Sequence, residues 1–290
     1  MLGETSMDFL DLLYSAILGV IQGITEWLPI SSTGHLLLAQ EFLNMNTTKD
    51  FMDMFNVVIQ FGSILAVIVL YFHKLNPFSP KKTLREKSET LHLWVKVLIA
   101  AVPGAVIGFL FDDIITGYLY NPLTIAIALI LYGILFIVLE SRHKKPQISA
   151  FPQMTYKVAL LIGVFQVLAL IPGTSRSGST ILGAVVLGCS RYVAAEFSFF
   201  LAIPMMLGAS GYKVLKFILG NGSFSANEWG ILLVGTVVSF LVSLFAIKFL
   251  MNYIKKHDFK AFGWYRIALG VIVILYFALF AADRLVSVAA

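Results

Sequence analysis

The sequence predicts an all-α polytopic membrane protein with six transmembrane helices, two re-entrant helix hairpins and an inverted-topology repeat. Three observations predict this fold class. First, 59% of the 290 residues are hydrophobic and 13% are charged, which leaves too few polar side chains to cover a water-soluble domain. Second, apolar runs of membrane-spanning length recur along the chain. Third, two apolar segments are broken near their centres and resemble each other.

Six apolar segments are long enough to cross the bilayer as helices. We expect them at about residues 51–72, 92–111, 123–140, 194–216, 229–250 and 265–283. Three loops between them are basic, with Lys74, Lys81, Lys82, Arg85 and Lys87 in 73–91, Arg142, Lys144, Lys145 and Lys157 in 141–157, and Lys255, Lys256 and Lys260 in 251–264. Basic loops mark the cytoplasmic side, so both termini are expected outside. The net charge of +5 therefore does not indicate a nucleic-acid partner.

The apolar segments at about 12–45 and 156–190 are interrupted by Pro, Gly, Ser and Thr. Unwound backbone at membrane depth is tolerated only where it is buried in protein or lines a wet cavity. We therefore interpret both segments as re-entrant hairpins, in which a helix enters the membrane, breaks and returns.

The two broken segments match at a constant offset of 144 residues. The pairs are Gly19 and Gly163, Val20 and Val164, Gln22 and Gln166, Ser31 and Ser175, and Gly34 and Gly178. Residues 1–290 are thus expected to form a single integral membrane domain with repeat halves at about 8–140 and 156–284. Each half has three crossings, an odd number, so the second half would insert upside down. The alternative is a chance match between two apolar, glycine-rich segments.

Each broken segment carries an ionisable residue that is costly to bury in a membrane. Arg176 is the only charged residue between Val158 and Ser190, and Glu26 lies in the first segment. Pairing the two would lower the cost, and such residues are functional candidates by default. The alternative is a purely structural ion pair that holds the hairpins together.

The second break has the composition of an anion site. Gly173 allows close backbone approach, and Ser175, Arg176 and Ser177 precede an apolar helix expected to begin near Thr180. Hydroxyls, a guanidinium and the free N–H groups of a helix N-terminus together favour phosphate.

The first break adds candidate reactive groups. Ser31, Ser32 and Thr33 supply hydroxyls, and His35 would share a helical face with Ser31 or Ser32. Either serine activated by His35, or His35 itself, could attack phosphorus, although a lone histidine in an apolar run is often only a packed residue. Glu26 and Gln22 lie on one helical face. They could hold a divalent cation such as Mg²⁺ or Ca²⁺ with phosphate oxygens, or Glu26 could orient His35.

The stretches QGITEWLPISSTGH (22–35) and PGTSRSGST (172–180) resemble the two signatures of the undecaprenyl-diphosphate phosphatase family, also called the bacitracin-resistance (BacA/UppP) family. The resemblance extends from about residue 8 to the C-terminus. It implies a bacterial cytoplasmic-membrane enzyme, open to the outer face, that converts undecaprenyl diphosphate to undecaprenyl phosphate with the support of a divalent cation. This product is the lipid carrier of cell-wall precursors, and excess enzyme gives bacitracin resistance.

The residues are assigned roles in this chemistry. Thr33, Gly173, Ser175, Arg176, Ser177 and Thr180 would bind the phosphates. Ser32 is the preferred nucleophile, with His35 as base and Glu26 orienting His35 or binding the cation. Assembly into a homodimer is left open. The competing hypothesis is a transporter or flippase that carries a phosphate-bearing lipid or anion in the same site without cleaving it.

The other polar residues at membrane depth are expected to have structural roles. Gln60, Lys96, Glu196 and Lys213 would cap helices, extend toward the interface or bond between helices.

Overall fold

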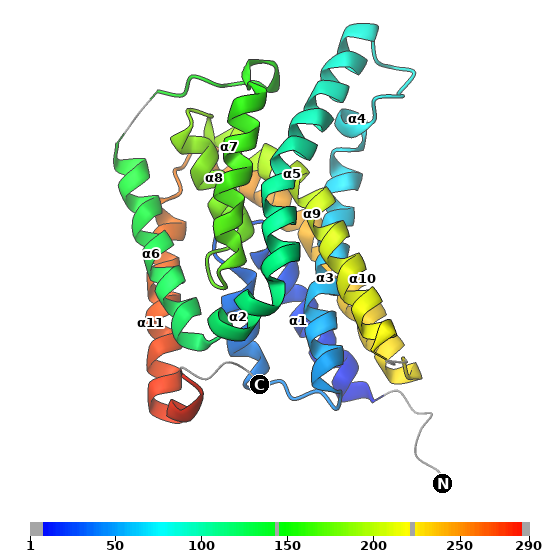
Figure 1. Ribbon diagram of the computed structural model, residues 1–290, viewed down its shortest axis with the longest axis vertical. Coiled ribbons are helices and arrows are strands. Elements are labelled where there is room, and N and C mark those ends of the chain that lie inside the picture. The colour runs from blue at the N-terminus through cyan, green and yellow to red at the C-terminus, as the bar shows by residue number, and fades with distance from the viewer. Residues whose placement is uncertain (1–7, 143–144, 221–223, 286–290) are drawn as a thin grey trace.

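The computed structural model describes residues 8–142, 145–220 and 224–285, and the regular structure within these ranges is helical (Figure 1). Six of the described helices are long and apolar enough to cross a membrane. They are α3 (Lys49–Leu70), α5 (Leu84–Leu119), α6 (Pro122–Ser141), α9 (Arg191–Leu219), α10 (Ala226–Tyr253) and α11 (Lys260–Phe280). The six predicted spans are thereby confirmed. Lys144, which entered the loop-charge prediction, lies outside the described residues.

The largest difference from the predicted spans is in α5, which begins at Leu84 and not near residue 92. The charged residues before 92 indicated a loop, but a reciprocal cap extends the helix through them. Glu86 N–H donates to Thr83 Oγ1 at 3.3 Å, and the Thr83 N–H donates to Glu86 Oε2 at 2.7 Å. This arrangement satisfies two backbone N–H groups at the helix start. Helix α5 therefore extends in the N-terminal direction past the apolar residues that begin near position 92.

Both broken segments form two short helices joined by irregular backbone. The first contains α1 (Phe9–Thr25) and α2 (Ser32–Gln40). The second contains α7 (Tyr156–Val167), a 3₁₀ turn at Leu168–Leu170 and α8 (Arg176–Val186). Helix α8 begins at Arg176, four residues before the predicted start near Thr180, because the Ser175 hydroxyl accepts a hydrogen bond from Gly178 N–H at 3.1 Å and caps the helix.

The two caps share a strained backbone. Ser31 and Ser175 both have φ of 72°, and they are the non-glycine residues with positive φ in the described part of the chain. Ser31 caps α2 through Gly34 N–H, as Ser175 caps α8 through Gly178 N–H. Positive φ costs an L-residue about 1 kcal/mol or more. The same unfavourable geometry therefore occurs at two positions that are 144 residues apart.

The helices pack in a crossed pattern. Helix α1 packs against α10, α7 against α5, α3 against α9, and α6 against α11. Glycine allows the closest approaches, since a Cβ on Gly19 would lie 2.7 Å from the Gly235 carbonyl oxygen, and one on Gly163 would collide with Ala100. Such small-residue contacts are typical of helix packing in membranes, where close van der Waals contact replaces the hydrophobic driving force.

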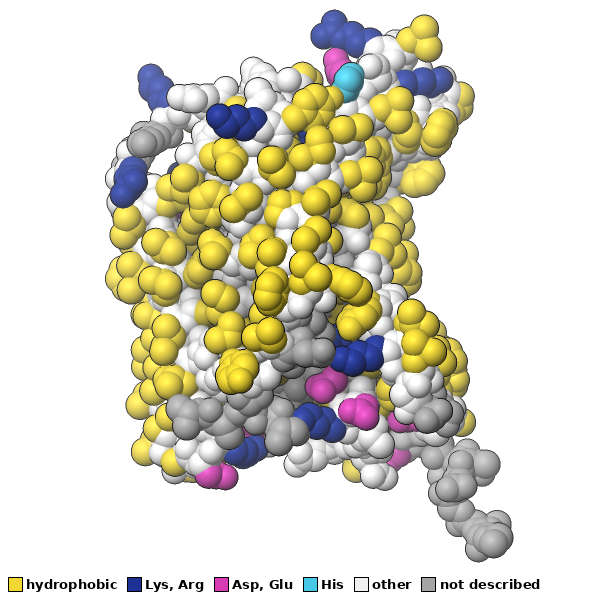
Figure 2. Space-filling model, viewed as in Figure 1, with side chains coloured by type: hydrophobic (Ala, Val, Ile, Leu, Met, Phe, Trp, Pro, Cys, Tyr) yellow, Lys and Arg dark blue, Asp and Glu magenta, His cyan; other side chains and the backbone are white. Residues whose placement is uncertain are grey.

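The surface agrees with a membrane location. Figure 2 shows hydrophobic side chains across the middle of one face, with Lys, Arg, Asp and Glu gathered toward the two ends. Helix α9 is the most buried of the six spanning helices, with 72% of its most apolar stretch inside the protein. It contacts α3, α5 and, in the second broken segment, α8, so it forms part of the protein interior beside that break.

Candidate active site

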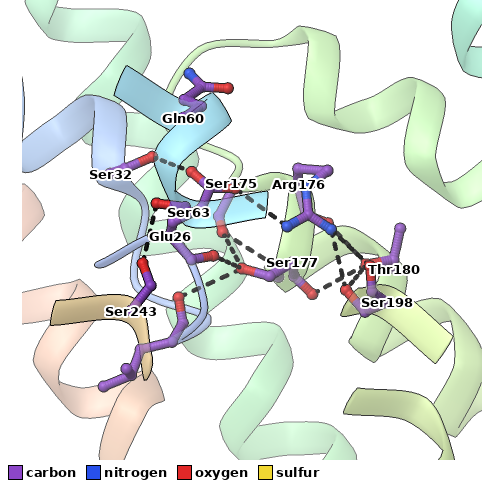
Figure 3. A network of polar contacts seen from close by, with 12 residues as sticks. Glu26, Ser32, Gln60, Ser63, Ser175, Arg176, Ser177, Thr180, Ser198 and Ser243 are labelled. Carbon is purple, nitrogen blue, oxygen red and sulfur yellow. Dashed lines mark hydrogen bonds and ion pairs between the residues drawn. The ribbon is translucent and has the colours of Figure 1, made fainter. Parts of the chain in front are cut away.

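A cavity of about 170 Å³ lies where the two breaks meet. Its lining comes from both breaks and from helices α3 and α9, and comprises Glu26, Ser32, Thr33, Gln60, Ala169, Pro172, Gly173, Ser175, Arg176 and Met206. Residues more than 140 positions apart thus share one polar cavity in an apolar protein. Figure 3 shows Glu26, Ser32, Ser175 and Arg176 gathered there from different elements.

Glu26 joins the two breaks. It follows α1 directly and is 6% exposed. Its Oε1 accepts from Arg176 Nη2 at 3.1 Å, and its Oε2 accepts from Gln22 Nε2 and from Ser32 Oγ, both at 3.0 Å. The predicted Glu26–Arg176 pair is present, and one carboxylate holds both a serine hydroxyl and a guanidinium at the cavity (Figure 3).

Arg176 is the first residue of α8 and is held from two sides. Its Nη1 donates to the Ser198 carbonyl oxygen at 2.8 Å, and its guanidinium lies 5.7 Å from the ring centroid of Trp27. The side chain is 13% exposed, and Nε has no hydrogen-bond partner. The fixed guanidinium thus presents a preorganised positive charge to the cavity, the kind of group that stabilises a phosphoryl group in transfer.

Two predicted phosphate ligands lie behind the cavity wall. Ser177 is buried and donates to the Glu26 carbonyl oxygen at 3.0 Å, and Thr180 is buried with its hydroxyl 2.6 Å from that of Ser198. They connect the second break to the first break and to α9. Of the predicted phosphate-binding residues, Thr33, Gly173, Ser175 and Arg176 are on the wall.

The structure places His35 away from the cavity. Its Nδ1 lies 2.7 Å from the Ser31 carbonyl oxygen and its Nε2 lies 2.7 Å from the Tyr265 hydroxyl. Because a carbonyl oxygen only accepts, Nδ1 carries the proton and the neutral Nε2 accepts from Tyr265. The Ser32 hydroxyl bonds to Glu26 and not to His35, while Ser31 serves as the α2 cap.

Sequence reasoning missed Arg266, which is fully buried in α11. It donates to the carbonyl oxygens of Gly173 and Thr174 at 2.9 Å and to that of Pro29 at 3.2 Å, so one side chain binds both breaks. An arginine at the beginning of a predicted span indicates an interfacial residue. Only its position in a long apolar run, with no other charge before Asp283, could have signalled burial. Gln60 and Met206 of the cavity wall were also missed.

Of the two predicted metal ligands, Glu26 lines the cavity and Gln22 does not, so a divalent cation there would need further oxygen ligands from the substrate. Among the described residues there is no group of three His, Cys, Asp or Glu side chains arranged to hold a metal. The Glu26 carboxylate and Gln22 Oε1, a buried oxygen without a hydrogen-bond partner, are the candidate ligands. Mg²⁺ and Ca²⁺ take oxygen ligands, and Mg²⁺ is often bound by one or two carboxylates and substrate phosphates.

Comparison with known proteins identifies the family. Residues 15–272 match the model of the bacitracin resistance protein BacA. The chain is 59% identical over 272 residues to the undecaprenyl-diphosphatase of Enterococcus faecalis, covering 93% of this chain and 99% of that protein. It is 60% identical over 274 residues to undecaprenyl-diphosphatase 1 of Clostridioides difficile, with 94% and 99% covered. The chain belongs to the bacitracin resistance protein BacA family.

Proposed function

We propose that this chain hydrolyses undecaprenyl diphosphate to undecaprenyl phosphate and inorganic phosphate, and so recycles the lipid carrier of cell-wall synthesis. The observation that carries the proposal is the Glu26 carboxylate, which holds the Ser32 hydroxyl and the Arg176 guanidinium at one cavity. These are a base, a nucleophile and a phosphate-binding cation in contact. Relatives that are 54–60% identical over almost the whole chain are named undecaprenyl-diphosphatase.

The first chemical step uses the contacts around Glu26. The diphosphate competes for the N–H groups of Arg176, and the carboxylate released from that pair can accept the Ser32 proton. The Ser32 oxygen bonds to the terminal phosphorus, and the bond from that phosphorus to the bridging oxygen breaks. Undecaprenyl phosphate leaves with the bridging oxygen and its electron pair. Arg176 stabilises the negative charge that develops on the transferred group.

The second step returns the enzyme to its starting state. Glu26, now protonated, gives its proton to the departing lipid phosphate and then accepts a proton from water. That water attacks the phosphoserine at Ser32. The oxygen of Ser32 leaves with its electron pair and takes from Glu26 the proton that came from the water, which releases inorganic phosphate and restores the carboxylate. Thr33, Ser175 and Gly173 line the cavity where the phosphoryl group would be held. His35 as a base would need a rearrangement of α2, since its ring nitrogens bond to Ser31 and Tyr265.

The decisive experiment compares Ser32→Ala with Ser31→Ala in purified protein. We expect Ser32→Ala to reduce phosphate release from undecaprenyl diphosphate by about 10³-fold or more, because it removes the nucleophile. Ser31→Ala removes a helix cap and is expected to lower stability more than chemistry. A phosphoserine trapped by rapid acid quench should map to Ser32. Near-normal turnover by Ser32→Ala would overturn the assignment.

The transporter hypothesis is less well supported. A carrier has no need for a serine hydroxyl bonded to a carboxylate beside a guanidinium, and the relatives have phosphatase names. Purified protein in detergent has no second compartment, so release of inorganic phosphate there would be hydrolysis alone. A carrier that does not cleave its cargo would release none.

We also propose that the helix pairs α1–α2 and α7–α8 are re-entrant hairpins of an inverted repeat with halves at about 8–140 and 156–284, within one domain. The crossed packing supports this arrangement, because α1 of the first half contacts α10 of the second, while α7 contacts α5. The matching strained caps at Ser31 and Ser175 also support it. Helices α1 and α7 begin at opposite ends of the molecule (Figure 1).

In the cell, the protein would lie in the bacterial cytoplasmic membrane with the cavity open to the outer face. The basic loops would face the cytoplasm. Gln22 and Glu26 would hold Mg²⁺ or Ca²⁺ together with substrate phosphate oxygens, and the bound cation would supply neutralising charge. Assembly into a homodimer stays a prediction.

A further inference from the structure

We propose that a second cavity, at the basic end of the molecule, binds the phosphate headgroup of an anionic amphiphile. This basic-end cavity has a volume of about 980 Å³. It lies between α4 (Phe72–Leu75), the first part of α5, the segment 149–156 and the start of α9, and it has no lining residue in common with the Glu26 cavity. The proposal does not depend on the proposed function.

The carboxylates that line this cavity already have partners. Glu196 forms an ion pair with Lys74 at 2.6 Å. Glu89 pairs with Arg85 at 3.0 Å, and Glu86 is bound within the cap of its own helix. Two of the three carboxylates are thus neutralised by Lys74 and Arg85, and two lysines remain against the single charge of Glu86.

That remaining charge comes from Lys82 and Lys96, two lysines without an ion pair in the described part of the chain. Lys82 Nζ donates to the Lys74 carbonyl oxygen at 2.9 Å and to the Thr90 hydroxyl at 2.8 Å. Lys96, which is 6% exposed, donates to the Phe151 carbonyl oxygen at 2.8 Å. An ammonium group has three donors, so both have capacity left, and a buried cation gains most from an anion that desolvates with it.

The rest of the lining favours an amphiphile over a free ion. Apolar and aromatic side chains include Leu70, Tyr71, Leu93, Phe151, Met154 and Val193. The cavity also lies at the end of the spanning helices that carries the basic loops, where lipid headgroups are found. Basic pockets between transmembrane helices on the cytoplasmic side are typical sites for anionic headgroups. A phosphate group offers several acceptor oxygens to ammonium donors.

Two lipids share this chemistry: a bilayer phospholipid and an isoprenyl monophosphate. The experiment uses the full chain in nanodiscs with a phosphatidylglycerol that carries a photoreactive group near its headgroup. Crosslinked peptides are mapped and quantified for the wild type, Lys82→Gln, Lys96→Gln and the double variant. Lys81→Gln is the matched control, because Lys81 is exposed, adjoins Lys82 and does not line the cavity.

We expect crosslinks in residues 70–96 and 149–156, weakened about fivefold for each cavity lysine removed and unchanged in Lys81→Gln. Phosphate release should stay within twofold of wild type, which also shows that the variants fold. Should Lys96→Gln fail to fold, Lys82→Gln in the loop before α5 carries the test alone.

Competition of unlabelled lipids against the photoreactive lipid distinguishes the two possible ligands. Competition by phosphatidic acid and phosphatidylglycerol alike supports a bilayer lipid, and selective competition by undecaprenyl phosphate supports the isoprenyl monophosphate. Equal labelling of wild type and double variant would overturn the proposal. So would equal labelling by a photoreactive phosphatidylcholine, or competition by inorganic phosphate as effective as that by lipids.

Discussion

Glu26 and Arg176 form a buried ion pair, to which we assign both a structural role and the chemical role proposed above. Glu26→Gln leaves the guanidinium of Arg176 without its counter-charge, which is expected to cost about 3–5 kcal/mol of unfolding free energy. The double variant Glu26→Leu with Arg176→Met replaces both charges by apolar groups. We expect it to recover most of the stability and none of the phosphatase activity, measured by thermal unfolding and phosphate release. If the double variant recovered phosphatase activity, the Glu26–Arg176 pair would have only a structural role.

Arg266 is expected to hold the breaks in position through backbone carbonyls. Arg266→Met leaves the carbonyl oxygens of Pro29, Gly173 and Thr174 without this donor, and each buried unsatisfied acceptor costs about 1–3 kcal/mol. We expect a loss of about 3 kcal/mol or more in detergent unfolding. Arg266→Lys retains a charge but not the fork of donors, so it should recover only part of the stability. Unchanged unfolding of the methionine variant would contradict this role.

At the scale of helices, the strained caps of α2 and α8 predict an unusual order of substitutions. Ser175→Ala loses the cap but keeps the unfavourable φ, whereas Ser175→Gly loses the cap and relieves the strain. The alanine variant is expected to lose about 0.5–2 kcal/mol and the glycine variant less. Ser31→Ala and Ser31→Gly should follow the same order in thermal unfolding. If alanine were as well tolerated as glycine at both sites, the positive φ would not be under strain.

The backbone groups at the two breaks are satisfied by side chains, so the helices can end within the protein interior. Each break contains backbone that would be unsatisfied in lipid, and it is bound instead by side chains such as Ser177 and Arg266. The same unwound backbone forms the cavity wall at Gly173 and Ser175. A continuous helix would not expose these backbone and hydroxyl groups, so the breaks are what make the polar cavity wall.

At the scale of the whole molecule, the topology predicts opposite labelling of its two ends. Cys189 is buried, so cysteines introduced at the surface would report with little background. Lys81→Cys, in a basic loop, should react with a membrane-impermeant thiol reagent only in inverted vesicles. Ala226→Cys, at the start of α10, should react in intact cells. Reaction of both sites from the same side would refute the six-span arrangement.

Much of this architecture was predictable because membranes constrain sequences strongly. A span needs about 20 apolar residues, so all six crossing helices were visible from composition alone. The start of α5 was misplaced because its cap lies among charged residues. The Glu26–Arg176 pair was also predictable, since each residue is isolated in an apolar segment and neither is tolerable alone.

The membrane class, the six spans, the two breaks and the identity of the charged residues in the apolar interior follow from the order of the amino acids. Which of these residues contact one another depends on how the distant helices pack. In the folded protein, the Ser32 hydroxyl bonds to Glu26 and the His35 ring bonds to Tyr265. Ser177 and Thr180 bond to groups outside the cavity lining, and Arg266 bonds to backbone carbonyls of both breaks. The physical reason is that hydropathy depends on each residue's own transfer free energy, whereas a hydrogen bond depends on the orientation of two side chains that the packing of distant helices sets.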